Sequence, residues 1–207
     1  ADLPQPGPVC ASCCEPLPTE PDQPLCCARC QQRPPPWSAC AAALPYEWPV
    51  DTALKALKFH GQLVYAAAFA ELLLPIVSTR FAEVDALCPV PLHRWRQARR
   101  GFNQAMELCR PLARALRLPV ASNLRRVRAT RPQSGLGRVA RRRNLHEAFA
   151  ISGPLRCRYP LLVDDIMTTG ETCWRLSELL LDSGAERVGV LTVARAASGY
   201  GRTGSSG

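Results

Sequence analysis

Two hydrophobic periods alternate along residues 46–196 of this chain. Apolar side chains recur every three or four residues, as in amphipathic helices, over residues 52–59, 63–74, 102–116 and 171–183. Short continuous apolar runs, typical of buried strands, cover residues 84–90, 161–165 and 187–194. Because helices and strands alternate, the pattern predicts an α/β fold, with a parallel sheet covered by helices on both faces.

The chain before residue 46 is rich in proline and cysteine instead. Prolines at positions 16, 18, 21 and 24 rule out a helix there, and Pro34-Pro35-Pro36-Trp37 is typical of a stiff linker. We therefore predict a small cysteine-rich unit at residues 1–33, a linker at 34–45, the main α/β domain at 46–196 and a disordered Gly/Ser-rich tail at 197–207.

Composition narrows the class of protein. With 47% hydrophobic residues in 207, the chain can bury a core, and no secretory signal or membrane span is readable. We therefore expect a cytoplasmic protein without membrane insertion. Seven of the 11 cysteines lie between Cys10 and Cys40. In a reducing compartment, metal binding explains such a cluster better than disulfides do.

The cysteine spacing predicts the metal. Cys10 and Cys13 form one Cys-x-x-Cys pair and Cys27 and Cys30 form a second, which matches a four-cysteine zinc ribbon. Four thiolates would close the coordination shell of Zn²⁺, so the ion would be structural rather than catalytic. Two further cysteines each neighbour a proposed ligand and remain alternatives: Cys14 and Cys26.

The segment most informative about function is residues 161–172, where an apolar strand leads into two carboxylates, a Thr/Gly loop and a helix. The start of a helix offers free N–H groups and a positive dipole end, which suit a phosphate. Carboxylates at the carboxyl end of a strand can accept hydrogen bonds from vicinal hydroxyls. The segment therefore favours a sugar phosphate over the alternative, a buried strand followed by a Thr-capped helix. Its candidate residues are Asp164, Asp165, Thr168, Thr169, Gly170, Glu171 and Thr172.

Arginine dominates the positive charge. The formal net charge is +9, and Lys55 and Lys58 are the only lysines. One run of arginines (Arg94, Arg96, Arg99 and Arg100) precedes Gly101 and Asn103 at a predicted helix start. A second run holds eight arginines in residues 125–143 and ends in Arg141, Arg142 and Arg143. We favour anion binding at both runs over the alternative of solvated charged surface. Lys58 is a further anion-binding candidate, or else an ordinary surface residue of a helix.

Several motifs occur together in a fixed order. They are the cysteine pairs, Leu57-Lys58-Phe59, Pro89-Val90-Pro91-Leu92, Arg100-Gly101-Phe102-Asn103-Gln104, Arg125-Arg126 with Pro132-Gln133 and Gly135-Leu136, and the Asp-Asp/Thr-Thr-Gly-x-Thr loop. Together they resemble the ComF competence-protein family, which includes the GntX-like proteins. The resemblance implies a zinc ribbon fused to a type I phosphoribosyltransferase domain. It also implies a role in handling single-stranded DNA during natural transformation or DNA utilisation, with a competence helicase as a candidate partner.

The resemblance also implies roles for the candidate residues. In type I phosphoribosyltransferases the acidic pair holds the ribose hydroxyls of 5-phosphoribosyl-1-pyrophosphate (PRPP), and the Thr/Gly loop holds its 5-phosphate. The expected ligand is thus PRPP or ribose 5-phosphate with Mg²⁺. Pyrophosphate would lie at Arg99, Arg100, Gly101 and Asn103, with Lys58 nearby, and we assign single-stranded DNA to Arg141, Arg142 and Arg143.

A general base is harder to find. Thr168 stands where purine-salvage relatives carry an aspartate, and Glu171 occupies a variable position of the motif. Three interpretations stay open: an acceptor that is already nucleophilic, a base supplied by a partner, or a site that only binds PRPP. The sequence therefore leaves two functions, a phosphoribosyltransferase and a non-catalytic DNA-binding module that keeps the fold.

Overall fold

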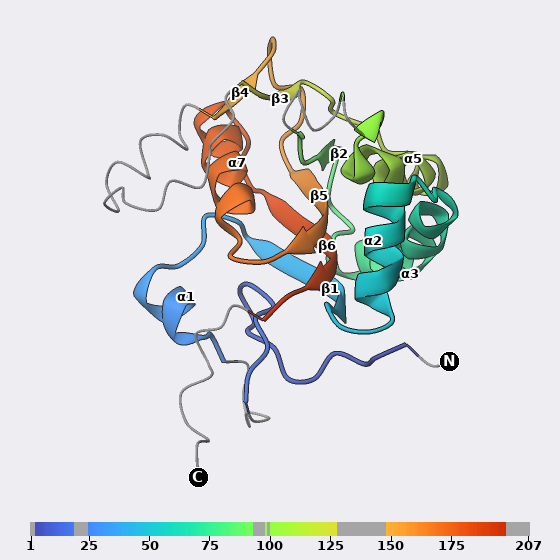
Figure 1. Cartoon of the computed structure of the whole chain (residues 1–207). Helices are drawn as coiled ribbons and strands as arrows, with labels where there is room; N and C mark the ends of the chain where they lie inside the picture. The colour runs from blue at the N-terminus through green and yellow to red at the C-terminus, as the bar shows by residue number, and fades with distance from the viewer. Residues whose placement is uncertain (1–2, 19–24, 93–97, 99, 128–147, 198–207) are drawn as a thin grey trace, which may run out of the picture.

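A parallel four-stranded sheet organises the molecule (Figure 1). The computed structural model describes residues 3–18, 25–92, 98, 100–127 and 148–197. The strand order is β1-β6-β5-β2, and every neighbouring pair is parallel. The strands are β1 (Ala39–Pro45), β2 (Ala86–Pro89), β5 (Pro160–Met167) and β6 (Gly189–Arg195).

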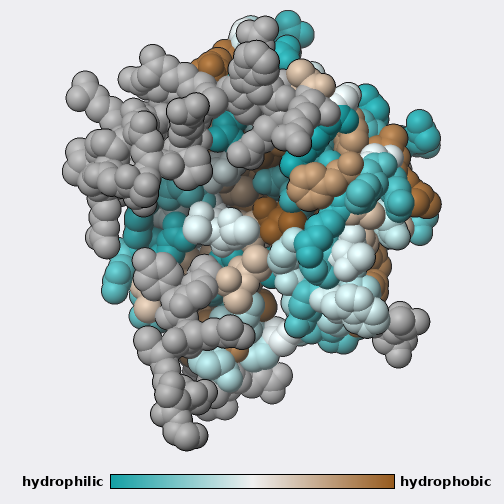
Figure 2. All heavy atoms as spheres, in the orientation of Figure 1, coloured by the Kyte–Doolittle hydropathy of each residue, from teal (hydrophilic) through white to brown (hydrophobic). Residues whose placement is uncertain are grey.

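Helices cover both faces of the sheet, so the predicted α/β architecture is confirmed. On one face lie α2 (Val50–His60), α3 (Val64–Arg80) and α5 (Gln104–Leu116). On the other lies α7 (Glu171–Asp182) (Figure 1). None of the described helices has both the length and the apolar character that a bilayer crossing requires. Figure 2 shows the same side of the molecule, where hydrophilic side chains surround a few hydrophobic atoms at the centre.

Alternation along β5 divides the core in two. Leu161 and Val163 pack with α2, α3 and α5, whereas Leu162 packs on the α7 side. The second core also contains Trp37, which meets Trp174 of α7 edge-to-face with 6.0 Å between the ring centroids. The cysteine-rich segment joins this second core, so it packs directly against the α7 face of the sheet.

The predicted linker at residues 34–45 is wrong in its second half. Residues 39–45 form β1, an edge strand paired with β6 from Ala39 opposite Gly189 to Pro45 opposite Arg195. Ser38 already donates its backbone N–H to the carbonyl of Val188 (2.9 Å). The apolar run that follows the prolines was short enough to pass for a connection, and pairing with a distant strand decides its conformation. From residue 198 on, the predicted tail lies outside the described residues.

Other boundaries shift by a few residues. Pro160 takes the first position of β5, where a missing N–H is tolerated. The helix predicted at 102–116 begins at Gln104, because the Asn103 side chain caps it by accepting from the N–H of Ala105 (3.0 Å). Three short elements were not predicted from the sequence: helix α1 (Ala28–Gln32) and the two strands of an antiparallel pair, β3 (Leu124–Arg126) and β4 (Phe149–Ile151).

Candidate functional site

The Thr/Gly loop joins β5 to α7 at the carboxyl end of the sheet. Thr168 and Thr169 are exposed, and Thr172 is half-buried in the first turn of α7. Gly170 caps the helix with φ of +73°, a left-handed conformation that L side chains rarely adopt. A strand end and a helix start therefore meet at an exposed turn, which is the geometry of an anion site.

The two carboxylates before the loop have different surroundings. Asp165 is 6% exposed and forms an ion pair with Lys58 of α2, with 2.9 Å between Nζ and Oδ2. Asp164 accepts the backbone N–H of Asp165 at Oδ1 (2.9 Å). Burial raises the pKa of Asp164 well above its usual range, and the neighbouring charge of Asp165 raises it further. A hydroxyl donor or a cation that arrives beside Asp164 would stabilise its ionised form.

Lys58 therefore lies in the site, but its partner is a carboxylate. Its side chain is 20% exposed and reaches from α2 to Asp165. The sequence offered Lys58 either to an anion or to solvent, and the structure shows it neutralising one member of the acidic pair. A lysine ammonium is a compact charge on a flexible stem, so this ion pair is held less rigidly than one made by the planar fork of an arginine.

The first arginine run is only partly described. Arg100 lies with its guanidinium carbon 5.1 Å from the centroid of the Phe59 ring. Gly101 has φ of +81°, and the Asn103 side chain donates to the carbonyl of Val90 (3.1 Å) while it caps α5. The Asn103 side chain is thus occupied by structural hydrogen bonds. Other candidates lie outside the described residues: Arg99, Arg141, Arg142 and Arg143.

Four cysteines converge in the N-terminal segment. The thiol sulfurs of Cys10, Cys13, Cys27 and Cys30 all lie within 4.8 Å of one another. Tetrahedral Zn–S bonds of about 2.3 Å require sulfurs roughly 3.8 Å apart, and the Cys13 and Cys27 sulfurs are separated by 3.7 Å. The cluster therefore has the dimensions of a four-thiolate metal site. We call residues 8–18 and 25–33, which carry it, the cysteine module.

Two thiols of the cluster lie in different environments, which shift their pKa values in opposite directions. Burial raises the pKa of Cys13 to about 12, because a thiolate there is poorly solvated. Burial also acts on Cys10, but hydrogen bonds, first that from the backbone N–H of Cys27, lower its pKa to about 7. The alternative ligands point elsewhere: the Cys14 sulfur lies 3.8 Å from that of Cys40, and the Cys26 sulfur lies 3.1 Å from Ser12 Oγ.

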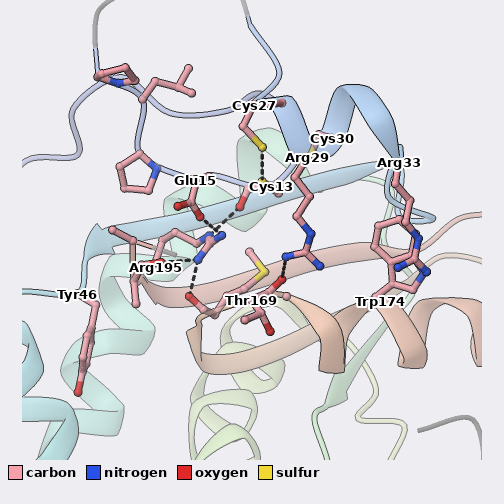
Figure 3. Close-up of a pocket in the computed structure, with 18 residues that line it drawn as sticks. Cys13, Glu15, Cys27, Arg29, Cys30, Arg33, Tyr46, Thr169, Trp174 and Arg195 are labelled. Atoms are coloured by element: carbon pink, nitrogen blue, oxygen red, sulfur yellow. Dashed lines mark hydrogen bonds and ion pairs between the residues drawn. The ribbon is translucent and has the colours of Figure 1, made fainter. Parts of the chain in front are cut away.

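Two arginines that the sequence analysis missed donate hydrogen bonds to backbone carbonyls of the loop. Arg195, at the end of β6, donates to the carbonyls of Met167 and Thr168, and Arg29 donates to that of Thr169 (Figure 3). Arg195 is 4% exposed. The available signal was a charge directly after the apolar strand run. These arginines line a cavity of about 760 Å³ between the cysteine module and the loop.

Comparison with known proteins identifies the family. No family model matches the chain. The DNA utilization protein YhgH of Escherichia coli O157:H7 is 39% identical over 177 residues, which are 83% of this chain and 78% of that protein. The Salmonella typhi YhgH protein is 40% identical with the same coverage. Competence protein F of Haemophilus influenzae Rd is 35% identical over 179 residues, 82% of this chain and 78% of that protein. The chain belongs to the ComF/YhgH family.

Solved structures similar to this ComF/YhgH chain include phosphoribosyltransferases. Orotate phosphoribosyltransferase from Aeropyrum pernix is 20% identical, with a TM-score of 0.42 over 66% of this chain and 62% of that one. An adenine phosphoribosyltransferase is 16% identical, with a TM-score of 0.39 over 70% of this chain and 84% of that one. At these identities and scores the likeness says nothing about the substrate.

Proposed function

We propose that this ComF/YhgH protein binds PRPP or ribose 5-phosphate and acts as a phosphoribosyltransferase-like protein in the handling of single-stranded DNA. The observation that carries the proposal is the joint position of an acidic pair and an exposed Thr/Gly helix start at the carboxyl end of β5. The relatives' names, DNA utilization protein and competence protein F, support the DNA context.

The ligand would use both parts of this segment. Its 5-phosphate would accept hydrogen bonds from the loop and from the hydroxyls of Thr168, Thr169 and Thr172. Its vicinal hydroxyls would donate to Asp164 and Asp165. This arrangement explains why a carboxylate with a raised pKa lies at the site, since hydroxyl donors favour its charged form.

For transfer, the leaving pyrophosphate must be neutralised while C1 becomes cation-like. Mg²⁺, bound with PRPP, would supply part of that charge. Arg100 is the described arginine of the run that we assign to pyrophosphate, and Lys58 lies at the acidic pair. When Lys58 leaves Asp165 for the ligand, the carboxylate would be freed for the ribose hydroxyls.

The four-cysteine cluster is proposed to hold Zn²⁺. Four thiolates with the observed separations suit this ion and leave it no open position for water or substrate. The metal would therefore stabilise the cysteine module and take no part in the transfer.

Calorimetry with a ligand series tests the sugar-phosphate proposal. Ribose 5-phosphate and PRPP, each with Mg²⁺, should bind the metal-loaded full chain, whereas ribose without phosphate should bind at least roughly tenfold more weakly, since charge-assisted hydrogen bonds contribute about 1.5–3 kcal/mol each. Equal affinity for ribose and ribose 5-phosphate would reject the loop as a phosphate site.

A second function is favoured by one observation. The carboxylate nearest the loop, Glu171, is held by Arg175 (3.1 Å from Nε to Oε1) and by Arg29 (3.7 Å), so it is poorly placed to act as a base. A non-catalytic module that binds single-stranded DNA needs no base. Pyrophosphate release from PRPP, assayed with and without an oligonucleotide, separates the two functions: release above the protein-free rate supports the transferase, and binding without release supports the module.

A further inference from the structure

We propose that the cysteine module sets the conformation of the Thr/Gly loop through two arginines, and that Arg195 is a positioning residue for the phosphate site. The ligand part of this inference rests on the proposed function, whereas the coupling between module and loop rests on the contacts alone.

Arg195 connects three parts of the chain. It ends β6, and its Nε donates to the carbonyl of Cys13 (3.0 Å). Its Nη1 donates to the carbonyls of Met167 (3.0 Å) and Thr168, and its Nη2 pairs with Glu15 (Figure 3). Cys13 and Glu15 belong to the module, and Met167 and Thr168 lead into the loop. One buried guanidinium therefore spans both, and its rigid fork fixes their separation.

Arg29 makes a second connection from helix α1. It donates to the carbonyl of Thr169, and its Nη2 lies 3.7 Å from Glu171 Oε2 (Figure 3). Arg29 lies in the sequence between Cys27 and Cys30, so its position follows the fold of the metal cluster. Together the two arginines hold three successive loop carbonyls, those of Met167, Thr168 and Thr169.

Because a trans peptide is planar, the direction of each loop carbonyl fixes the direction of the N–H group that follows it. In each peptide unit the C=O of one residue and the N–H of the next point in opposite directions. Carbonyls 167, 168 and 169 face the guanidinium groups of Arg195 and Arg29, so the N–H groups of Thr168, Thr169 and Gly170 face away from these arginines. Successive backbone N–H groups on one side of a turn form an anion-binding concavity. The module arginines thus hold the loop with its donors presented to a phosphate.

The metal cluster should affect the loop because it holds two hydrogen-bond partners of Arg195 in place. Cys13 is a cluster residue, and Glu15 lies two residues further on. If the module unfolds, the buried guanidinium loses the Cys13 carbonyl and the Glu15 carboxylate. Arg195 would lose its carboxylate partner but keep its remaining carbonyl partners, at Met167, Thr168 and Ala196. Since removal of one member of a buried ion pair is costly, the end of β6 and the loop should rearrange. Metal loading and loop conformation are therefore coupled.

Hydrogen exchange measures this coupling without a ligand. The reporter of loop exchange is the Ala196 amide, which donates to the Met167 carbonyl (3.0 Å). In the metal-loaded full chain, Arg195→Met should speed exchange at this amide by roughly tenfold or more, since the loop loses hydrogen bonds to a charged group, which contribute about 1.5–3 kcal/mol each. Arg195→Lys, which keeps the charge but loses the fork, should give an intermediate rate. Glu15→Gln leaves Arg195 in place and should also speed exchange, which keeps the test valid if Arg195→Met does not fold.

Arg33→Met is the matched control. Arg33 is also an arginine of the module, but it stacks on Trp174 (3.6 Å from Cζ to the ring centroid) and lies 3.7 Å from Glu178, beyond the loop. Its removal should leave exchange at the Ala196 amide unchanged. Removal of the metal with a chelator should reproduce the effect of Arg195→Met. Unchanged loop exchange in Arg195→Met, Glu15→Gln and the metal-free protein would overturn the coupling.

Ribose 5-phosphate binding then tests the positioning role. If the wild type binds, Arg195→Lys should weaken the affinity roughly tenfold, by about 1.4 kcal/mol, and Arg33→Met should leave it unchanged. Unchanged affinity in Arg195→Lys despite faster loop exchange would reject Arg195 as a positioning residue. If the wild type does not bind at all, the proposed function fails, while the exchange measurements still decide the coupling.

Discussion

The two sides of the Thr/Gly loop differ in how their polar groups are satisfied. On the module side, loop carbonyls accept from Arg195 and Arg29, and Arg195 is buried. On the other side, the Thr168 and Thr169 side chains are exposed, and a partly exposed lysine meets the acidic pair. The polar groups on the module side thus have protein partners, whereas the opposite side carries exposed hydroxyls, which we propose bind a ligand. In our proposal, the hydrogen bonds on the module side hold the loop so that its opposite side can bind a phosphate.

The two sides of the loop also differ in their cationic side chain, which is an arginine on the module side and a lysine at the acidic pair. Arg195 spans several acceptors with a rigid planar fork, which suits a permanent connection. Lys58 makes a single ion pair with Asp165 and has a flexible stem. A site that must exchange partners gains from a cation that can move away. Variants on each side of the loop should therefore have separable effects.

Loss of a metal ligand should have the largest effect, because it removes the support of the module side. Structural zinc contributes on the order of 10 kcal/mol to the folding of such units. Cys13→Ser should therefore lose the metal and unfold the cysteine module, measured by metal analysis and by proteolysis between residues 8 and 33. Cys26→Ser, at a neighbouring thiol outside the cluster, should keep both. Full metal occupancy in Cys13→Ser would remove Cys13 from the site.

Loss of the acidic pair should be next, and it acts on the ligand side. Asp164→Asn/Asp165→Asn should weaken ribose 5-phosphate binding by roughly 3–6 kcal/mol, because charge-assisted hydrogen bonds contribute about 1.5–3 kcal/mol each. Calorimetry measures the change, and exchange in the loop should stay near the wild-type rate. Equal affinity of the double variant and the wild type would place the ribose elsewhere.

A salt series tests whether the second arginine run, at residues 125–143, binds single-stranded DNA. Single-stranded DNA affinity should fall with salt, with a log–log slope of about −0.7 per phosphate neutralised. Arg141→Ala/Arg142→Ala/Arg143→Ala should reduce that slope by roughly 2, measured by fluorescence anisotropy with a labelled oligonucleotide. The control is Arg110→Ala/Arg158→Ala/Arg187→Ala, whose arginines pair with carboxylates in the structure. An unchanged slope in the first variant would exclude this run as the DNA site.

A pH series tests the carboxylate of Asp164 through the stability of the protein. Because the folded-state pKa of Asp164 lies above its unfolded value, the native state holds this proton more tightly. The contribution of Asp164 to the free energy of unfolding should therefore fall as the pH rises from about 4 toward the folded pKa, by about 1.4 kcal/mol for each pH unit between the unfolded and folded pKa values.

The Asp164→Asn variant isolates this contribution. Denaturant unfolding of wild type and variant from pH 4 to 8 should show their difference changing in favour of the variant as the pH rises. The exposed Asp182→Asn provides the control. If the difference in the free energy of unfolding between wild type and variant does not change with pH, the folded structure does not raise the pKa of Asp164.

The sequence predicted much of this molecule, because the relevant signals are local. Residues 161–172 contain both a strand end and a helix start, and each Cys-x-x-Cys pair is likewise a motif of neighbouring residues. Helical and strand periods in turn fixed the α/β class. Strand β1 escaped prediction because its partner β6 lies about 150 residues away, from Ala39 to Gly189. A short apolar run has no local feature that distinguishes an edge strand from a connection.

By itself the sequence determined which groups are available: two adjacent carboxylates, a Thr/Gly loop, four spaced thiols and an excess of arginine. Tertiary structure alone decided their partners. It brought Lys58 of α2 to Asp165, and Arg195 of β6 between the cysteine module and the loop. These pairs join residues far apart in the chain, so they exist only in the folded structure, where the cost of burying an unpaired charge favours them.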